Sequence, residues 1–207
     1  MKLYYSETLM PRKVCALARH LRSPVEFVPV DVRRGEHKTA EFAAMNPNLK
    51  VPVLAHDGGT IWESNAIMCF LARQAGSDLF PADDRLVEMT RWLCWDLQHF
   101  TRYTGELYFE HVIRAEFGIG EPDPAAVEEA MGYVRKYAGV LNDHLAGREW
   151  LVGHAMTVAD FAVAIALPYA ERAKIPLAEF PEVARWHDQL NQLPAWRDPF
   201  PPAVAAA

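Results

Sequence analysis

The first 76 residues combine short apolar runs with stretches in which apolar side chains recur at helical spacing. Residues 3–5 form a β-prone run, and after a polar turn the apolar positions from Val14 to Leu21 have helical spacing. The same reasoning predicts a strand at 26–32, a helix at 40–45, a hairpin of strands at 51–55 and 60–62, and a helix from Ser64 to near Gly76. This order predicts a small α/β domain over residues 1–76.

The pattern changes after residue 76. Residues 77–84 contain turn formers, a proline and acidic side chains, and we expect a linker there. Beyond it the apolar positions have helical spacing, in long segments at 86–100, 127–145 and 183–193, with a loop at 118–124. The sequence therefore predicts an all-helical domain over 85–207, with a loose tail from Pro199 onward.

One further helix has a recognisable start at Thr157-Val-Ala-Asp160. The threonine hydroxyl can accept from the amide three residues later, and the aspartate can reach back to the threonine amide, as in a capping box. Phe161 and Ile165 then make the helix part of a core. We assign Asp160 to folding rather than to catalysis.

Charge and composition narrow the functional classes. The 207 residues carry a formal net charge of -6, so no global positive field favours nucleic acid as a partner. No apolar run is long enough for a signal peptide or a membrane span, and we expect a cytoplasmic protein that binds no membrane. Cys15, Cys69 and Cys94 have neither disulfide nor metal-site spacing, which predicts reduced structural thiols and no metal.

Three motifs stand in a fixed order along the chain: Asn46-Pro-Asn-Leu-Lys-Val-Pro-Val-Leu54, Trp62-Glu-Ser-Asn-Ala-Ile67 and Thr157-Val-Ala-Asp-Phe161. Together they resemble the cytosolic glutathione transferase family, of a serine/theta-like or bacterial type. The resemblance implies a thioredoxin-like α/β N-terminal domain, a helical-bundle C-terminal domain and glutathione as co-substrate. It also implies a homodimer, and a detoxifying enzyme whose other substrate is a small hydrophobic electrophile.

The motifs also propose glutathione-binding residues. By resemblance, the Val51-Pro52 bond is cis, and the backbone of Val51 pairs with the cysteinyl part of glutathione. Glu63 and Ser64 stand where a strand gives way to a helix, so the Ser64 hydroxyl and the free amides can bind an α-carboxylate while Glu63 holds an ammonium. The alternative for Ser64 is a simple helix cap.

Two lysines are candidates for the glycyl carboxylate at the other end of glutathione. The resemblance favours Lys38 and Lys50 over the neighbouring Arg33 and Arg34. The other interpretation of each lysine is a solvated surface charge.

The residue that activates the glutathione thiol is expected just before the first helix. The spacing that the family uses places it at Thr8, with Ser6 as the second choice and Tyr5 or Tyr4 as the third. Thr8 departs from the usual serine or cysteine, and it could instead be a helix-entry cap. Leu49 stands where many members have glycine.

The electrophile is expected to contact Met10, Trp95, Arg102 and Tyr103, although aromatic residues at helical spacing also suit a core. Three functions remain open at this point. The first is a glutathione transferase. The alternatives are a catalytically silent binding or regulatory protein, and a glutathione-dependent isomerase or dehalogenase. Because Thr8 replaces a cysteine, disulfide exchange is disfavoured.

Overall fold

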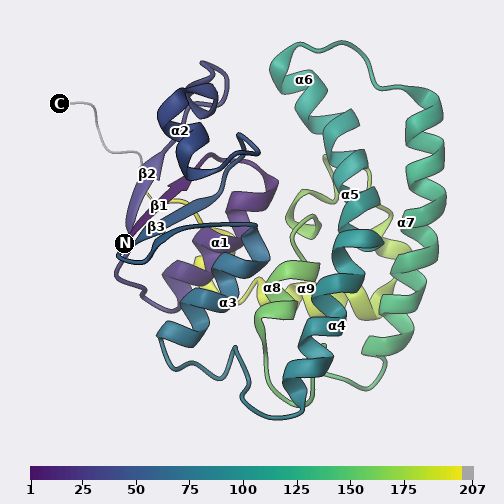
Figure 1. The fold of residues 1–207 in the computed structure, drawn as a ribbon. Coiled ribbons are helices and arrows are strands. Elements are labelled where there is room, and N and C mark those ends of the chain that lie inside the picture. The colour runs from purple at the N-terminus through teal and green to yellow at the C-terminus, as the bar shows by residue number, and fades with distance from the viewer. Residues whose placement is uncertain (202–207) are drawn as a thin grey trace. The chain divides into compact units, whose positions relative to one another are not determined.

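The computed structural model describes residues 1–201 of the chain (Figure 1). They form two compact units. One consists of residues 1–77 together with the segment that begins at Leu193, and the other of residues 78–192.

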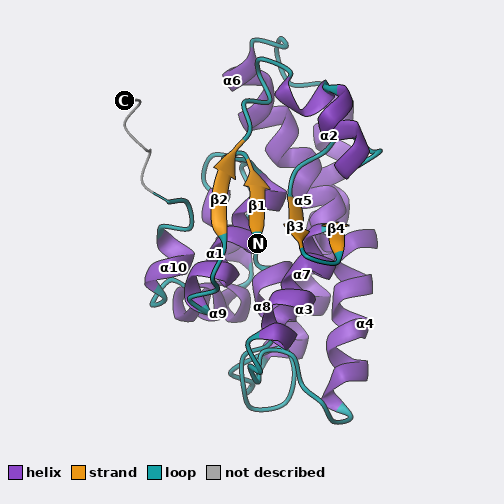
Figure 2. Cartoon of the chain, turned by 60° about the vertical axis from the view of Figure 1, so that its left-hand side comes forward, coloured by secondary structure: helices purple, strands orange, loops and turns teal. Residues whose placement is uncertain are grey.

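The first unit contains a mixed four-stranded sheet with helices on its faces (Figure 2). Its elements are β1 (Lys2–Tyr5), α1 (Leu9–His20), β2 (Glu26–Pro29), the 3-10 turn η1 (Glu36–Lys38), α2 (Ala40–Met45), β3 (Val53–His56), β4 (Gly59–Trp62), α3 (Ser64–Gln74) and α10 (Pro194–Arg197). The strand order is β2-β1-β3-β4, with β1 parallel to β2 and antiparallel to β3, and β3 antiparallel to β4. The predicted thioredoxin-like α/β fold is confirmed.

Alternation along β1 separates the two faces of this sheet. Leu3 and Tyr5 are buried on one face, while Tyr4 on the other packs edge-on against Phe42 of α2, with ring centroids 6.4 Å apart. α1 and α3 pack against each other, and Val14, Leu17 and Ala18 of α1 are buried, while Leu21 after the helix is half-buried. Both faces of the sheet are therefore covered, as the apolar character of its strands requires.

Proline sets the limits of two strands. β2 ends at Pro29, earlier than predicted, and it is an edge strand, where a residue without an N–H costs no ladder bond. β3 begins at Val53 rather than at residue 51, because Pro52 has no N–H to donate to the ladder.

The C-terminal segment departs from the prediction, which gave every residue after 84 to the helical domain. From Leu193 the chain belongs to the first unit, where α10 packs on α1. Pro199 is buried, and the ring of Phe200 stacks on Tyr5 with centroids 5.8 Å apart, so these residues are not a loose tail. Residues 202–207 of the expected tail lie outside the described part of the chain.

The second unit is helical. It comprises α4 (Arg85–Gln98), α5 (Phe100–Tyr108), the π-helical turn η2 (Phe109–Ile113), α6 (Arg114–Phe117), α7 (Pro124–Leu145), α8 (Val158–Val163), the 3-10 turns η3 (Leu167–Tyr169) and η4 (Leu177–Glu179), and α9 (Pro181–Leu190). Figure 1 shows α5 and α7 lying side by side. The periodicity predicted α4, α7, α8 and α9, but it missed the continuation of helix through 117 after a break at His99.

The capping box at the start of α8 is confirmed. The carboxylate of Asp160 accepts from the Thr157 amide at 2.7 Å and from the Leu151 amide at 3.1 Å, and the Trp186 indole N–H donates to it at 3.0 Å. Asp160 is fully buried, and this burial raises the pKa of its carboxyl to about 6. Its hydrogen bonds join α8, α9 and the loop at Leu151, which supports a folding role.

Within residues 1–201, no helix combines the length and the apolar character needed to cross a membrane.

Candidate functional site

The register of the sheet brings three chain segments to the same end of its strands, and we call this end the candidate edge. Tyr4 of β1 lies opposite Val53 of β3, and Val53 lies opposite Trp62 of β4. Since β3 runs against both neighbours, the residues after Tyr4, those before Val53 and those after Trp62 all leave the sheet at this same edge. The edge therefore gathers the segments 5–8, 50–52 and 63–64, which hold most of the candidate residues.

The Val51-Pro52 peptide bond is cis, as the resemblance implied. Pro52 is buried, and neither the amide nor the carbonyl of Val51 has a hydrogen-bond partner among the described residues. An unpaired amide and carbonyl at the end of a strand can bind an extended peptide by strand addition.

Asn46 holds the loop that leads to this bond. Its side-chain amide donates to the Lys50 carbonyl at 2.7 Å, and its Oδ1 accepts from the Asn48 amide at 3.0 Å. Leu49 in the same loop has a φ of 55°, the left-handed region that glycine adopts without strain. The glycine that the resemblance implied at this position would adopt this conformation without strain. The role of Asn46 was missed, although it opens the first motif.

α3 begins at the same edge in an unusual conformation. Glu63 occupies the N-cap position with φ 72° and ψ 115°, and Ser64 is the first helical residue. The cap interpretation of Ser64 is therefore wrong. Ser64 is buried, with its hydroxyl 3.9 Å from the Met10 sulfur, and the first amides of α3 have no partner within the helix. A buried hydroxyl beside free helix-start amides can bind a carboxylate.

Two hydroxyls lie at the start of α1. The oxygens of Ser6 and Thr8 are 3.0 Å apart, within hydrogen-bonding distance. Thr8 is the N-cap residue by backbone position, but its side chain makes no capping hydrogen bond. The hydroxyl pair therefore does not serve to cap α1, and the cap interpretation of the Thr8 hydroxyl is wrong.

Tyr5, the third candidate, has its ring occupied. It packs edge-on against Phe27 at 6.1 Å and stacks on Phe200, and burial raises the pKa of its phenol. A buried phenol held between two rings is less suited to meet a ligand at the edge than Thr8 is.

The two lysines are exposed. Lys50 directly precedes Val51, so it lies beside the edge. Lys38 ends the turn η1, and Thr39 after it caps α2 by accepting from the Phe42 amide at 3.2 Å. Their role toward a carboxylate stays a prediction.

The residues predicted for the electrophile are divided between the units. Met10 lies at the candidate edge, whereas Trp95, Arg102 and Tyr103 belong to α4 and α5 of the second unit. There the ring of Tyr103 stacks on Tyr133 of α7 at 4.3 Å. That face of Tyr103 serves the packing of α5 on α7, and the electrophile pocket stays a prediction.

The cysteines are not part of this edge. Burial raises the pKa of Cys15 to about 12 and that of Cys69 to about 11, while Cys94 is exposed on α4. Within residues 1–201, no group of three or more metal-binding side chains is found.

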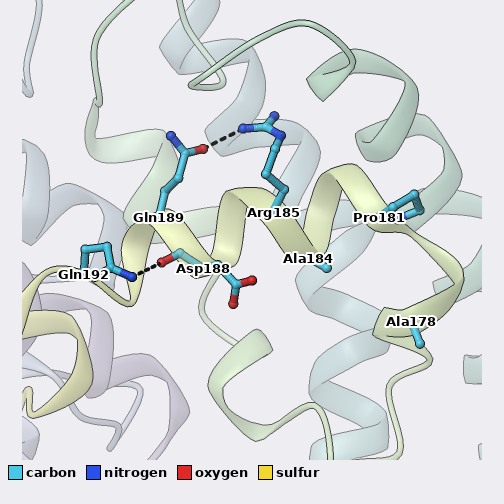
Figure 3. A pocket seen from close by; sticks show the side chains of 7 residues that line it. All are labelled: Ala178, Pro181, Ala184, Arg185, Asp188, Gln189 and Gln192. Atoms are coloured by element: carbon cyan, nitrogen blue, oxygen red, sulfur yellow. Dashed lines mark hydrogen bonds between the residues drawn. The ribbon is translucent and has the colours of Figure 1, made fainter.

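A separate hollow runs along α9 in the second unit (Figure 3). Its lining includes Arg185, whose guanidinium donates to Glu182, to Gln189 and to the backbone carbonyls of Leu145 and Arg148. The arginine thus holds α9 against the end of α7, and we give this hollow no functional role.

Comparisons with known proteins agree with this geometry. Residues 1–73 match the model of the glutathione S-transferase N-terminal domain, and residues 92–194 match that of the C-terminal domain. Glutathione S-transferase 3 of Zea mays is 33% identical over 194 residues, covering 88% of this chain and 86% of that protein. Disulfide-bond oxidoreductase YfcG of Escherichia coli (strain K12) is 26% identical over 201 residues, covering 93% and 91%.

Among solved structures, the glutathione transferase URE2P6 of Phanerochaete chrysosporium, in complex with oxidized glutathione, is similar with a TM-score of 0.83 and 27% identity, covering 96% of this chain and 93% of that one. The matched domains span most of the chain. The chain therefore belongs to the glutathione S-transferase family.

Proposed function

We propose that this protein is a glutathione transferase that activates bound glutathione as a thiolate for attack on a small hydrophobic electrophile. The observation that carries the proposal is the shared sheet edge. Tyr4, Val53 and Trp62 are in register on adjacent strands, so the segments that hold Thr8, Val51 and Ser64 leave the sheet at this same edge. These groups match the backbone, the charged end and the sulfur of one tripeptide.

Binding would use each group in turn. The amide and carbonyl of Val51 pair with the cysteinyl residue, and the Ser64 hydroxyl with the first α3 amides binds the γ-glutamyl α-carboxylate. Glu63 is exposed and ionisable next to that site, so it can hold the α-ammonium. Lys50, and less directly Lys38, can meet the glycyl carboxylate.

Thiolate activation requires little free energy. A free thiol of pKa about 8.5 is only about 3% ionised at pH 7, and lowering its pKa by two units takes about 2.7 kcal/mol. One hydrogen bond to a charged group supplies about 1.5–3 kcal/mol. The Thr8 hydroxyl is therefore sufficient, and Ser6 can orient it by donating its own proton to the Thr8 oxygen, which leaves the Thr8 proton for the thiolate.

The reaction then needs no covalent enzyme intermediate. The thiolate sulfur forms a bond to an electrophilic carbon, the leaving group departs with its electron pair, and the thiol proton has already passed to solvent. Homodimerisation, which the resemblance implied, is part of this proposal.

A second candidate is disulfide-bond reduction, favoured by the name of the similar Escherichia coli protein. It would revise the expectation that a threonine at position 8 disfavours such chemistry. Neither Cys15 nor Cys69 is a suitable thiolate, since burial raises both pKa values. Two glutathione molecules would then supply both electrons, the first forming a mixed disulfide and the second releasing oxidised glutathione.

Calorimetric titration of glutathione into the wild-type protein and into Ser64→Ala tests binding. Saturable heat that the variant loses supports the site, while no heat with the wild type at millimolar glutathione would overturn it. Turnover of an activated chloronitrobenzene is then compared with reduction of a small organic disulfide. Binding with neither activity would leave the silent binding protein, and isomerisation or dehalogenation without net glutathione consumption would identify glutathione as a true cofactor.

A further inference from the structure

A second pocket lies in the first unit, at the end of α1 that is farther from Thr8. It is lined by Arg19, His20, Arg22, Pro194, Ala195, Arg197 and Asp198. The end of α1 and the helix α10 form its walls, so it exists only because the chain returns to this unit after residue 192.

The pocket gathers positive charge in an acidic chain. Arg19, Arg22 and Arg197 contribute three guanidinium groups and Asp198 one carboxylate, which leaves a formal charge of about +2, against -6 for the whole chain. None of the three arginines forms an ion pair within 4.0 Å with an acidic residue of the described chain, not even with Asp198 in the same pocket.

The cationic groups of the pocket come from different elements of the first unit. The Arg19 side chain donates to the Phe200 carbonyl, which fixes its direction. Arg22 follows α1 in a left-handed backbone conformation, with φ 51°, and Arg197 ends α10. Burial lowers the pKa of His20, so this ring adds no charge at neutral pH. Two arginines from separate segments thus share one hollow with a third that is already oriented.

We propose that this pocket binds the phosphate group of a small phosphorylated molecule. The planar guanidinium fork donates two parallel hydrogen bonds to phosphate oxygens, and a phosphate dianion matches the charge of the pocket. Pro194 and Ala195 form an apolar wall against which the carbon side of a phosphate ester can lie.

This pocket is independent of the glutathione proposal. α1 contains 12 residues, so its ends are about 18 Å apart, with Thr8 at one end and Arg22 beyond the other. Phosphate binding can therefore be measured without glutathione, and the failure of one proposal leaves the other untouched.

The test is calorimetric titration of inorganic phosphate, and separately of glycerol phosphate, at constant ionic strength and about pH 8, where phosphate is a dianion. We expect saturable binding that Arg22→Gln/Arg197→Gln weakens by at least about tenfold. Asp198→Asn should tighten binding several-fold, because it removes the opposing charge. The matched control is Arg34→Gln/Arg73→Gln, which removes two exposed arginines of the same unit and should leave binding unchanged.

Any of these results would overturn the proposal: no saturable heat with either ligand, equal weakening by the control pair, or no gain from Asp198→Asn. Binding of inorganic phosphate with exclusion of glycerol phosphate would refute the assignment to a phosphorylated molecule. Thermal unfolding of each variant shows whether the fold is intact.

Discussion

The hydroxyl oxygens of Ser6 and Thr8 lie 3.0 Å apart, so one of the two donates to the other. If Ser6 donates, the Thr8 oxygen loses a lone pair but keeps its own proton to give to a thiolate. If Thr8 donates, Ser6 is the group left to activate the sulfur. Removing the Ser6 hydroxyl and removing the Thr8 hydroxyl should therefore lower activity to different extents. The larger loss identifies the residue that activates the thiol.

We expect Thr8→Val to lower kcat/KM by about 10- to 100-fold, since it removes a hydrogen bond to a charged group while keeping the side-chain shape. The pKa of bound glutathione, followed by thiolate absorbance against pH, should rise by one to two units, on the order of that loss. Thr8→Ser is the control and should keep the low pKa. A larger loss in Ser6→Ala than in Thr8→Val would transfer the role to Ser6.

Asp160→Asn should destabilise the second unit by about 2–4 kcal/mol. The pKa of about 6 means that the carboxyl is ionised at pH 7.5, where it accepts hydrogen bonds from two amides and an indole. An amide in its place would present an N–H toward one of these donors, leaving buried groups unpaired. Urea unfolding measures the loss. Asp143→Asn, on an exposed position of α7, is the control and should change little.

His144 should make folding stability fall in mild acid. Its Nε2 hydrogen-bonds the Leu151 carbonyl at 2.9 Å, and burial lowers the pKa of the ring below 6.5. The unfolded chain therefore takes up the proton first, so this contribution is complete above pH 6.5 and is lost as the pH falls from there through the lower pKa of the folded ring. The melting temperature of the wild type relative to His144→Gln should drop between pH 7.5 and 5.5. The exposed His154→Gln variant should show no such trend.

Arg185→Ala should separate α9 from the end of α7. The guanidinium is half-exposed. It donates to the carbonyl of Leu145, the last residue of α7, and to the carbonyl of Arg148 just after this helix. Losing these bonds should cost about 1–2 kcal/mol, discounted for solvent screening of the charged pair with Glu182. The comparison is Arg135→Ala, which breaks only an exposed pair with Glu179 and should lower the melting temperature less.

Features that depend on neighbouring residues could be predicted from the sequence. The capping box needs only Thr157 and Asp160, three residues apart, and the strands and helices of the first 76 residues follow from local periodicity. The residue types alone favour a trans bond before Pro52, since most proline peptide bonds are trans. Only the resemblance implied the cis Val51-Pro52 bond.

Features that depend on distant residues could not. Phe200 stacks on Tyr5 although the two residues are 195 positions apart in the sequence, and no spacing rule predicts such a contact. The periodic apolar pattern ended at residue 100, so it did not predict that helical structure resumes after the break at His99 and passes through the π-helical turn at 109–113. The conformation of Glu63 is set by the turn from β4 into α3, which the residue type alone does not reveal.

The return of the chain to its first unit has a consequence for biosynthesis. Arg12 donates to the Trp196 carbonyl at 2.7 Å, and its guanidinium lies 5.0 Å from the centre of that indole ring. The hydrogen bond and the cation–π contact can form only after the ribosome has synthesised all of residues 78–192. A nascent chain therefore leaves the tunnel with α1 lacking one of its partners, and the intervening helices have the first opportunity to finish folding.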